Sequence, residues 1–286
     1  MATAVTVLGI GIMGAGMAKN LAGAGFDVTV WNRTPEKAWP LADAGATIAP
    51  DVASAVADAD IVLTMLFDLE AVTAVMEQAL PTVRAGTVWV QSSTVGVDGT
   101  VSLAGLAERH GVGFVDAPVL GTRQPAEQGT LTVLAGGPTA LRDAVSPVFD
   151  AIGSRTVWVG EQPGDGHRLK LTVNSWVLSV VAGTAQAVEL AGDLGLDPQM
   201  FLDTIAGTPT DCAYVQLKGK TMLAKEFPPA FPLIGALKDA ALIAQAMHAV
   251  GTDDRLMQVV QTQLEAAADA GHGDEDIAAV VYAFRR

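Results

Sequence analysis

The amino-acid sequence predicts two domains: an α/β domain built on a parallel sheet, and an all-helical domain joined to it by a long central helix. In the first half, short β-branched runs alternate with Ala-rich segments of helical length, a pattern typical of βαβ units. In the second half, helical segments follow one another without a convincing strand. Residues 160–166 hold three glycines and one proline, which favours a turn-rich boundary. We therefore predict domains over residues 1–162 and 163–286.

The central strands of the first domain are apolar on both faces, as in a sheet covered by helices on both sides. The predicted strands are residues 4–8, 27–31, 61–66, 87–91, 113–116, 132–135 and 156–159. The predicted helices between them are residues 13–24, 35–44, 52–57, 69–80, 97–110 and 138–152. In the second domain we predict the central helix over residues 168–194, followed by helices at 198–206, 215–224, 237–250 and 253–270.

Composition and charge restrict the class of function. The chain has 286 residues and a formal net charge of −14 at pH 7, which argues against nucleic acid or an anionic membrane as partner, because phosphate contacts need a basic face. No uninterrupted apolar stretch of about 18 residues is present, and the N-terminus does not resemble a signal peptide, so we expect a cytoplasmic protein. With one cysteine and four scattered histidines, no metal site is expected.

A glycine-rich turn directly follows the first predicted strand and opens the first predicted helix. In the pattern Gly-x-Gly-x-x-Gly, the first glycine permits the tight turn, the second lets the backbone approach a pyrophosphate, and the third allows close packing of helix on strand. Tight packing alone would also explain glycines, but the strand–turn–helix context favours a dinucleotide, whose phosphates would meet N–H groups at the helix N-terminus. The predicted cofactor residues are Gly9, Gly11, Ile12, Met13 and Gly14.

The end of the second predicted strand favours NADP(H) over NAD(H). Sites that prefer NAD usually place an Asp or Glu here to accept a hydrogen bond from the ribose 2′-OH. This chain has Asn32, Arg33 and Thr34 instead. Arg33 can stack on the adenine or pair with a 2′-phosphate, and Asn32 or Thr34 can add hydrogen bonds. Alternatively, Arg33 is a solvated residue at the end of a strand.

Four motifs recur in order along the chain: residues 9–14 with Ala18-Lys19-Asn20-Leu21, Asp116-Ala-Pro-Val-Leu-Gly121, Gly166 to Asn174, and Lys238-Asp239. With these motifs the sequence resembles the β-hydroxyacid dehydrogenase family. Residues 28–34, 125–129 and 227–233 are similar to the glyoxylate/succinic semialdehyde reductase branch of that family. The resemblance implies a Rossmann-like first domain, a cleft between domains where substrate and nicotinamide meet, and a homodimer or homotetramer formed through the helical domain. A mean hydropathy of +0.36 agrees with apolar surface buried between subunits.

Lys170 and Asn174 are the predicted catalytic residues. They lie four residues apart on the predicted central helix, so both side chains project from one face. An ammonium near the substrate oxygen can donate a proton as hydride reaches the carbon, and Asn174 could hold that oxygen or the lysine. A helix lysine is by default a surface residue whose charged end reaches solvent. The family motif favours the catalytic interpretation.

The remaining predicted site residues concern substrate and nicotinamide. The turn after Leu120 can offer backbone N–H groups and a hydroxyl to a substrate carboxylate, through Gly121 and Thr122. By resemblance, Thr94 would contact substrate and nicotinamide, and Phe231 and Asp239 would close the pocket, with Lys238 as a structural ion-pair partner. Met65 and Leu66 would line the adenosine side of the cleft, although core packing at a strand end explains them equally well.

Leu120 departs from the family pattern, which has a serine at this position to contact the carboxylate.

The leading hypothesis is an NADPH-dependent reductase of small aldehydes that bear a carboxylate, or the reverse oxidation of a β-hydroxy acid. Leu120 suggests an alternative, reduction of an imine or of a bulkier, less anionic carbonyl compound. A non-catalytic NADP-binding sensor is a further alternative, against which Lys170 and Asn174 argue. Decarboxylating chemistry on 6-phosphogluconate is disfavoured, because the helical domain is short.

Overall fold

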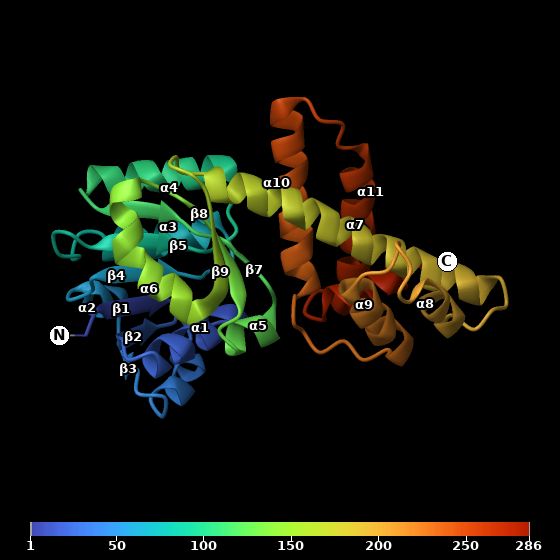
Figure 1. The fold of residues 1–286 in the computed structure, drawn as a ribbon, viewed down its shortest axis with the longest axis horizontal. Helices are drawn as coiled ribbons and strands as arrows, with labels where there is room; N and C mark the ends of the chain where they lie inside the picture. The colour runs from blue at the N-terminus through green and yellow to red at the C-terminus, as the bar shows by residue number, and fades with distance from the viewer. Residues whose placement is uncertain (1, 286) are drawn as a thin grey trace. The chain divides into compact units, whose positions relative to one another are not determined.

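The computed structural model describes residues 2–285 and divides the chain into two compact units, of which unit 1 ends at Lys170 and unit 2 begins at Leu171. In the described part of unit 1, a nine-stranded sheet is flanked by helices (Figure 1). The division falls inside helix α7 (Asp165–Asp193), shortly after the predicted boundary at residues 162–163. The first turn of α7 belongs to unit 1 because backbone N–H groups at its start are hydrogen-bonded to Asp116 of the sheet.

The sheet has the strand order β3-β2-β1-β4-β5-β6-β8-β7, with β9 paired to β8. All pairings from β3 to β6 are parallel, whereas β8 runs antiparallel to both β6 and β7. The order reverses direction between β1 and β4, and ligands of such sheets bind beside the carboxyl ends of the strands at this point. The strands are β1 (Ala4–Leu8), β2 (Asp27–Trp31), β3 (Thr47–Ile48), β4 (Ile61–Thr64), β5 (Val88–Gln91), β6 (Gly113–Asp116), β7 (Val119–Leu120), β8 (Leu131–Gly136) and β9 (Gly153–Gly160).

Each face of the sheet is covered by its own set of helices, as the apolar strands predict. Val5 and Val7 of β1 join one buried cluster, while Leu8 joins the cluster on the opposite face, because successive side chains of a strand point to opposite sides. The first cluster includes α1 (Ile12–Gly23), α5 (Arg123–Glu127) and α6 (Arg142–Ile152). The second includes α2 (Val52–Val56), α3 (Leu69–Ala79) and α4 (Val97–Arg109).

Unit 2 is built from helices and contains a buried ion pair. Lys218 Nζ lies 2.6 Å from Asp276 Oδ1, and both side chains are almost fully buried. Asp276 also accepts backbone N–H bonds from Ala230 and Phe231, so its carboxylate anchors the Pro-rich segment before α10. The elements after α7 are α8 (Gln199–Ile205), α9 (Ala213–Ala224), α10 (Leu233–Val250), α11 (Arg255–Ala267), a π-helical turn (Ala268–His272) and the 3₁₀ helix η5 (Ile277–Phe284).

Helices α7 and α10 are each long and apolar enough to cross a membrane by length and composition alone. Each nevertheless carries a buried polar side chain, Asn174 on α7 and Asp239 on α10, and these two are hydrogen-bonded to each other. Of the apolar 18-residue windows of these helices, 44% is buried in α7 and 33% in α10, so neither window is mostly buried within the described residues.

Several predicted elements differ from those observed. Residues 35–44 form two short 3₁₀ turns, Pro35–Lys37 and Trp39–Leu41, rather than one helix, because Pro40 has no N–H to donate within a continuous helix. The helix predicted to reach residue 270 ends at Ala267, ahead of Gly271 with φ +99°. The two-residue strands β3 and β7, the antiparallel pairing of β8 and the helix η5 were not predicted from the sequence.

Candidate functional site

The glycine-rich turn lies between the carboxyl end of β1 and the start of α1. Gly9 has φ +105°, and a Cβ atom there would lie 2.3 Å from the Met65 carbonyl oxygen. A Cβ at Gly14 would lie 1.9 Å from the carbonyl oxygen of Gly9. A Cβ at Gly11, by contrast, would have no atom within 4 Å. Packing therefore requires Gly9 and Gly14, while Gly11 leaves open space over the helix N-terminus.

The N-terminus of α1 has the properties of an anion site. Its N-cap residue, Gly11, makes no side-chain cap, and no acidic side chain lies in the first turn. The first N–H groups of a helix lack intrahelical partners and carry the positive end of the helix dipole, so Ile12 and Met13 lie where a pyrophosphate would be bound. Met65 and Leu66, after β4, lie against Gly9 as the border of this turn. These residues fit a dinucleotide.

Asn32, predicted as a cofactor contact, uses its side chain within the protein. Its Oδ1 accepts the N–H of Ile10 in the glycine-rich turn at 2.9 Å, and its Nδ2 donates to the carbonyl oxygen of Thr34 at 2.8 Å. Asn32 therefore ties the loop after β2 to the turn after β1. Arg33 and Thr34 are exposed, and Arg33 forms no ion pair with a carboxylate of residues 2–285.

Lys170 lies on the second turn of α7 and is 9% exposed. Its Nζ donates a hydrogen bond of 2.8 Å to the carbonyl oxygen of Val119 in β7. This contact holds the ammonium beside the backbone that leads directly into Leu120, Gly121 and Thr122. The residues predicted to donate a proton and to bind a substrate carboxylate therefore lie together in unit 1.

The predicted substrate loop begins at the end of β7. Leu120 is half-buried and pairs with Thr132 of β8, so its backbone is held in the sheet. Gly121 has φ +120°, a conformation that side-chain-bearing residues rarely adopt, and a Cβ there would lie 2.7 Å from Leu131 Cδ2. Thr122 precedes α5 and is half-buried.

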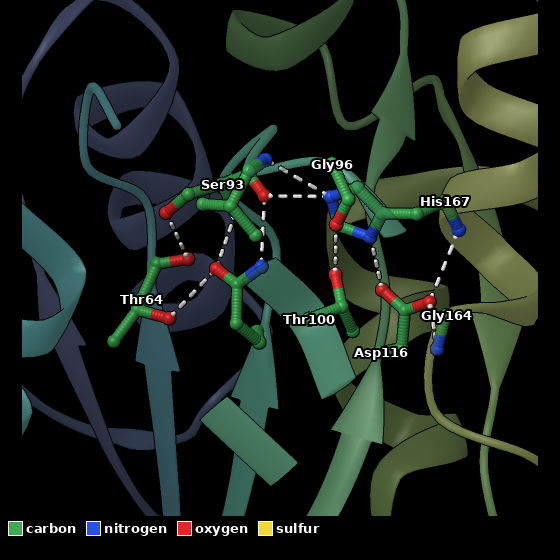
Figure 2. Close-up of polar contacts among 9 residues, drawn as sticks. Thr64, Ser93, Gly96, Thr100, Asp116, Gly164 and His167 are labelled. Atoms are coloured by element: carbon green, nitrogen blue, oxygen red, sulfur yellow. Dashed lines mark hydrogen bonds and ion pairs between the residues drawn. The ribbon is translucent and has the colours of Figure 1, made fainter. Parts of the chain in front are cut away.

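Thr94 lies in the loop between β5 and α4, next to a network of buried polar side chains. Gln91 Oε1 accepts the N–H of Ser93, and Gln91 Nε2 donates to the Ser93 carbonyl oxygen, both at 2.8 Å. The Ser93 hydroxyl accepts the N–H of Leu66 at 2.8 Å, which links this loop to the end of β4. Figure 2 shows the network continuing to Asp116 and His167.

In unit 2, Asn174 and Asp239 form a buried pair. Asn174 Nδ2 donates to Asp239 Oδ2 at 2.7 Å, and Lys238 Nζ lies 3.2 Å from Asp239 Oδ1. An ionised carboxylate can only accept, so the NH₂ group of Asn174 must face Asp239. Phe231 lies in the segment anchored by Asp276. Asp239 thus has an orienting role toward Asn174 that the sequence did not reveal.

Comparison with known proteins identifies relatives over nearly the whole chain. The chain is 34% identical over 289 residues to glyoxylate/succinic semialdehyde reductase 1 of Arabidopsis thaliana, covering 98% of each protein. It is 33% identical over 281 residues to the chloroplastic reductase 2 of the same name and organism, covering 97% of this chain and 78% of that protein. A solved structure of 3-hydroxyisobutyrate dehydrogenase from Mycobacterium tuberculosis with L-serine is 31% identical, with a TM-score of 0.89 over the full length of both chains.

Family models match both halves of the molecule. The NAD-binding domain of 6-phosphogluconate dehydrogenase matches residues 4–160, and the NAD-binding family of NADP-dependent 3-hydroxyisobutyrate dehydrogenase matches residues 164–284. The chain belongs to the β-hydroxyacid dehydrogenase family. It is an NAD(P)-dependent oxidoreductase, and the glycine-rich turn of unit 1 is where its nicotinamide cofactor fits.

Three buried residues of this dehydrogenase were given no functional role by sequence reasoning: Gln91, Asp116 and His167. Asp116 stands in the family motif, and His167 lies three residues before Lys170. Their side chains converge at the carboxyl edge of the sheet only because parallel strands β5 and β6 are adjacent and α7 starts beside them. For Gln91 and Asp116, the available signal was a polar residue at the end of an apolar strand, a position where parallel sheets place their binding residues.

We expect Asn32→Ala to weaken binding of NADPH and NADH by the same factor. The substitution leaves the Ile10 N–H without its side-chain acceptor, which loosens the turn that both cofactors share. A hydrogen bond of this kind contributes about 0.5–1.5 kcal/mol, or roughly two- to tenfold in affinity. Fluorescence titration of both cofactors measures it, with the exposed Asp43→Ala as control. Loss confined to NADPH would mean that Asn32 contacts the 2′-phosphate itself.

Proposed function

We propose that this dehydrogenase is an NADPH-dependent reductase of short aldehydes that carry a carboxylate, of the glyoxylate and succinic semialdehyde type, and that it also oxidises the corresponding hydroxy acids. The observation that carries the proposal is the Lys170 ammonium, buried beside the backbone of Val119 at the entrance to the Leu120–Thr122 turn. The names of the two Arabidopsis relatives support this substrate class.

Lys170 acts as the proton donor. When bound, the nicotinamide cofactor would supply a hydride to the carbonyl carbon. Lys170 Nζ–H then gives a proton to the carbonyl oxygen, so that the C=O bond becomes CH–OH, and the neutral amine regains a proton from water. In the oxidation direction the neutral amine takes the hydroxyl proton as hydride leaves. Asn174 is the second catalytic residue predicted from the sequence, and within unit 2 its side-chain amide is oriented by Asp239.

The preference for NADPH is assigned to Arg33. Its guanidinium is exposed at the end of β2 and has no carboxylate partner among residues 2–285, so it is available to a phosphate. No acidic side chain stands at positions 32–34 to accept from a ribose 2′-OH or to repel a 2′-phosphate.

We expect Arg33→Ala to remove most of the preference for NADPH. A charge-assisted hydrogen bond contributes on the order of 1.5–3 kcal/mol, so NADPH affinity should fall about ten- to a hundredfold while NADH affinity stays nearly constant. Titration of both cofactors against the parent and the variant measures this, with the exposed Arg155→Ala as a matched control. Equal affinities for the two cofactors in the parent protein would contradict the assignment.

Lys170→Met should lower turnover about 10²–10⁴-fold while preserving the fold and cofactor binding, because it keeps the length of the side chain and removes the proton donor. The measurements are steady-state NADPH oxidation, cofactor titration and thermal melting. Arg168→Met, an exposed cation on the same helix, is the control and should keep parental turnover. Near-parental turnover of Lys170→Met would mean that water or another group protonates the product.

Reduction of an imine or of a bulkier ketone is the second candidate function, and Leu120 favours it. An isobutyl group next to the Gly121–Thr122 turn offers a carboxylate no hydrogen bond, whereas it can contact an apolar substrate. A panel of glyoxylate, succinic semialdehyde, apolar ketones and cyclic imines separates the two. A sensor without catalytic activity would bind NADPH and reduce none of them.

We expect slow reduction of glyoxylate and succinic semialdehyde with a high KM, and improvement of both by Leu120→Ser. A hydroxyl at this position would add a hydrogen bond to a charged group, which strengthens binding by about 1.5–3 kcal/mol, or roughly ten- to a hundredfold. Apolar carbonyl compounds should become poorer substrates of the variant. Paired kinetics with Leu217→Ser, an exposed leucine of unit 2, as control measure both effects. Efficient reduction of the short acids by the parent, unchanged by the serine, would mean that Leu120 points away from the carboxylate.

A further inference from the structure

The loop that carries Thr94 is held on both sides by buried side chains. On one side, the Gln91 amide bonds both the N–H and the carbonyl oxygen of Ser93. On the other side, the N–H of Val95 donates to Nε2 of His167 at 3.1 Å. Gln91 and His167 are both fully buried, so neither bond competes with solvent. The residues flanking Thr94 are therefore fixed by two side chains from different elements.

The hydrogen bonds around His167 determine which ring nitrogen carries the proton. Nε2 lies 3.1 Å from two groups, the N–H of Val95 and the carbonyl oxygen of Ser93. The Ser93 oxygen already receives a bond from Gln91, whereas His167 is the partner of the Val95 N–H. Nε2 is thus the acceptor, and the proton lies on Nδ1, which donates to Asp116 Oδ1 at 2.6 Å.

Asp116 connects the same ring to the helix of Lys170. Its Oδ2 accepts the backbone N–H groups of Gly164 and His167, at 3.1 and 3.0 Å, at the start of α7 (Figure 2). A carboxylate at a helix N-terminus is favoured by the helix dipole. Lys170 follows His167 by three residues, so the two project from neighbouring positions of α7. One imidazole therefore joins the Thr94 loop, the end of β6 and the turn that carries Lys170.

We propose that His167 is a positioning residue that fixes the Thr94 loop relative to Lys170 through its Nε2–Val95 bond. This inference rests on the proposed function, because Thr94 and Lys170 are the residues whose relative placement it controls. Misplacement of reacting groups by about 1 Å can lower a rate on the order of 10²-fold without loss of binding. Loss of the bond should therefore reduce kcat more than it reduces NADPH affinity, which the glycine-rich turn supplies.

Two substitutions of His167 distinguish the roles of its two ring nitrogens. Asn reaches the position of Nδ1 and can keep the bond to Asp116, while Gln reaches the position of Nε2 and can accept from Val95. We expect His167→Asn to lower kcat on the order of 10- to 100-fold with NADPH affinity changed less than about threefold, and His167→Gln to restore much of kcat. His110→Asn, an exposed histidine of unit 1, is the control and should keep parental kinetics. Equal kcat in parent and His167→Asn, or equal losses in the Asn and Gln variants, would overturn the proposal.

Hydrogen–deuterium exchange of the peptide that contains Ser93 to Gly96 tests the same bond without turnover. His167→Asn should speed exchange there, and His167→Gln should not. If the parent reduces no carbonyl compound or imine, the proposed function fails, yet the exchange result still decides whether His167 fixes the loop. Should His167→Asn not fold, His167→Gln alone carries the test, because it can accept from Val95 while it loses the imidazole bond to Asp116. Near-parental kcat and exchange of the Ser93–Gly96 peptide support the positioning role, whereas a 10- to 100-fold loss of kcat with parental exchange overturns it.

Discussion

The start of α7 and the position of His167 depend on one buried carboxylate. Asp116 ends β6 with no solvent exposure, and a carboxylate so placed must find several donors, because an unpaired buried charge is strongly unfavourable. Its donors are two backbone N–H groups at the start of α7 and the Nδ1 of His167. Satisfying it therefore sets where the long helix begins, and the start of that helix determines where Lys170 meets Val119. The hydrogen bonds that the buried Asp116 needs at the end of β6 thus determine the position of Lys170 on α7.

Local patterns predicted the fold well where apolar runs are long and failed where tertiary contacts decide the structure. Strands β1 and β2 were predicted to the residue, and α1 within a residue at each end, because a buried sheet needs continuous apolar side chains. Strands β3 and β7 have two residues each and exist only through pairing with β2 and β8. The apolar run of η5 carries no signal for a 3₁₀ helix, and its start is set by Asp276, whose side chain accepts the N–H of Ala278.

The candidate site likewise has parts that local sequence predicts and parts that only tertiary contacts determine. The glycine-rich turn is encoded locally, since its residues are contiguous and packing requires glycine at both Gly9 and Gly14. The internal role of Asn32 was not predictable, because its bond to Ile10 arises only once β1 and β2 lie in register. The same applies to Gln91 and His167, which are 76 positions apart yet flank one loop. Asp116 and His167 both lie within sequence motifs, yet the hydrogen bonds by which they orient the loop and the helix become visible only in three dimensions.

The open space at Gly11 sets the stability of the fold against binding of the cofactor. Gly11 is the N-cap of α1 with φ −92° and ψ −162°, a conformation open to any residue, and a Cβ there would touch nothing. Serine is a preferred N-cap and restricts the unfolded chain more than glycine, so Gly11→Ser would be selected in a screen for heat resistance. Its hydroxyl would occupy the same N–H groups that a pyrophosphate needs. Selecting variants of this enzyme for stability of the fold alone would therefore weaken binding of its cofactor at this turn.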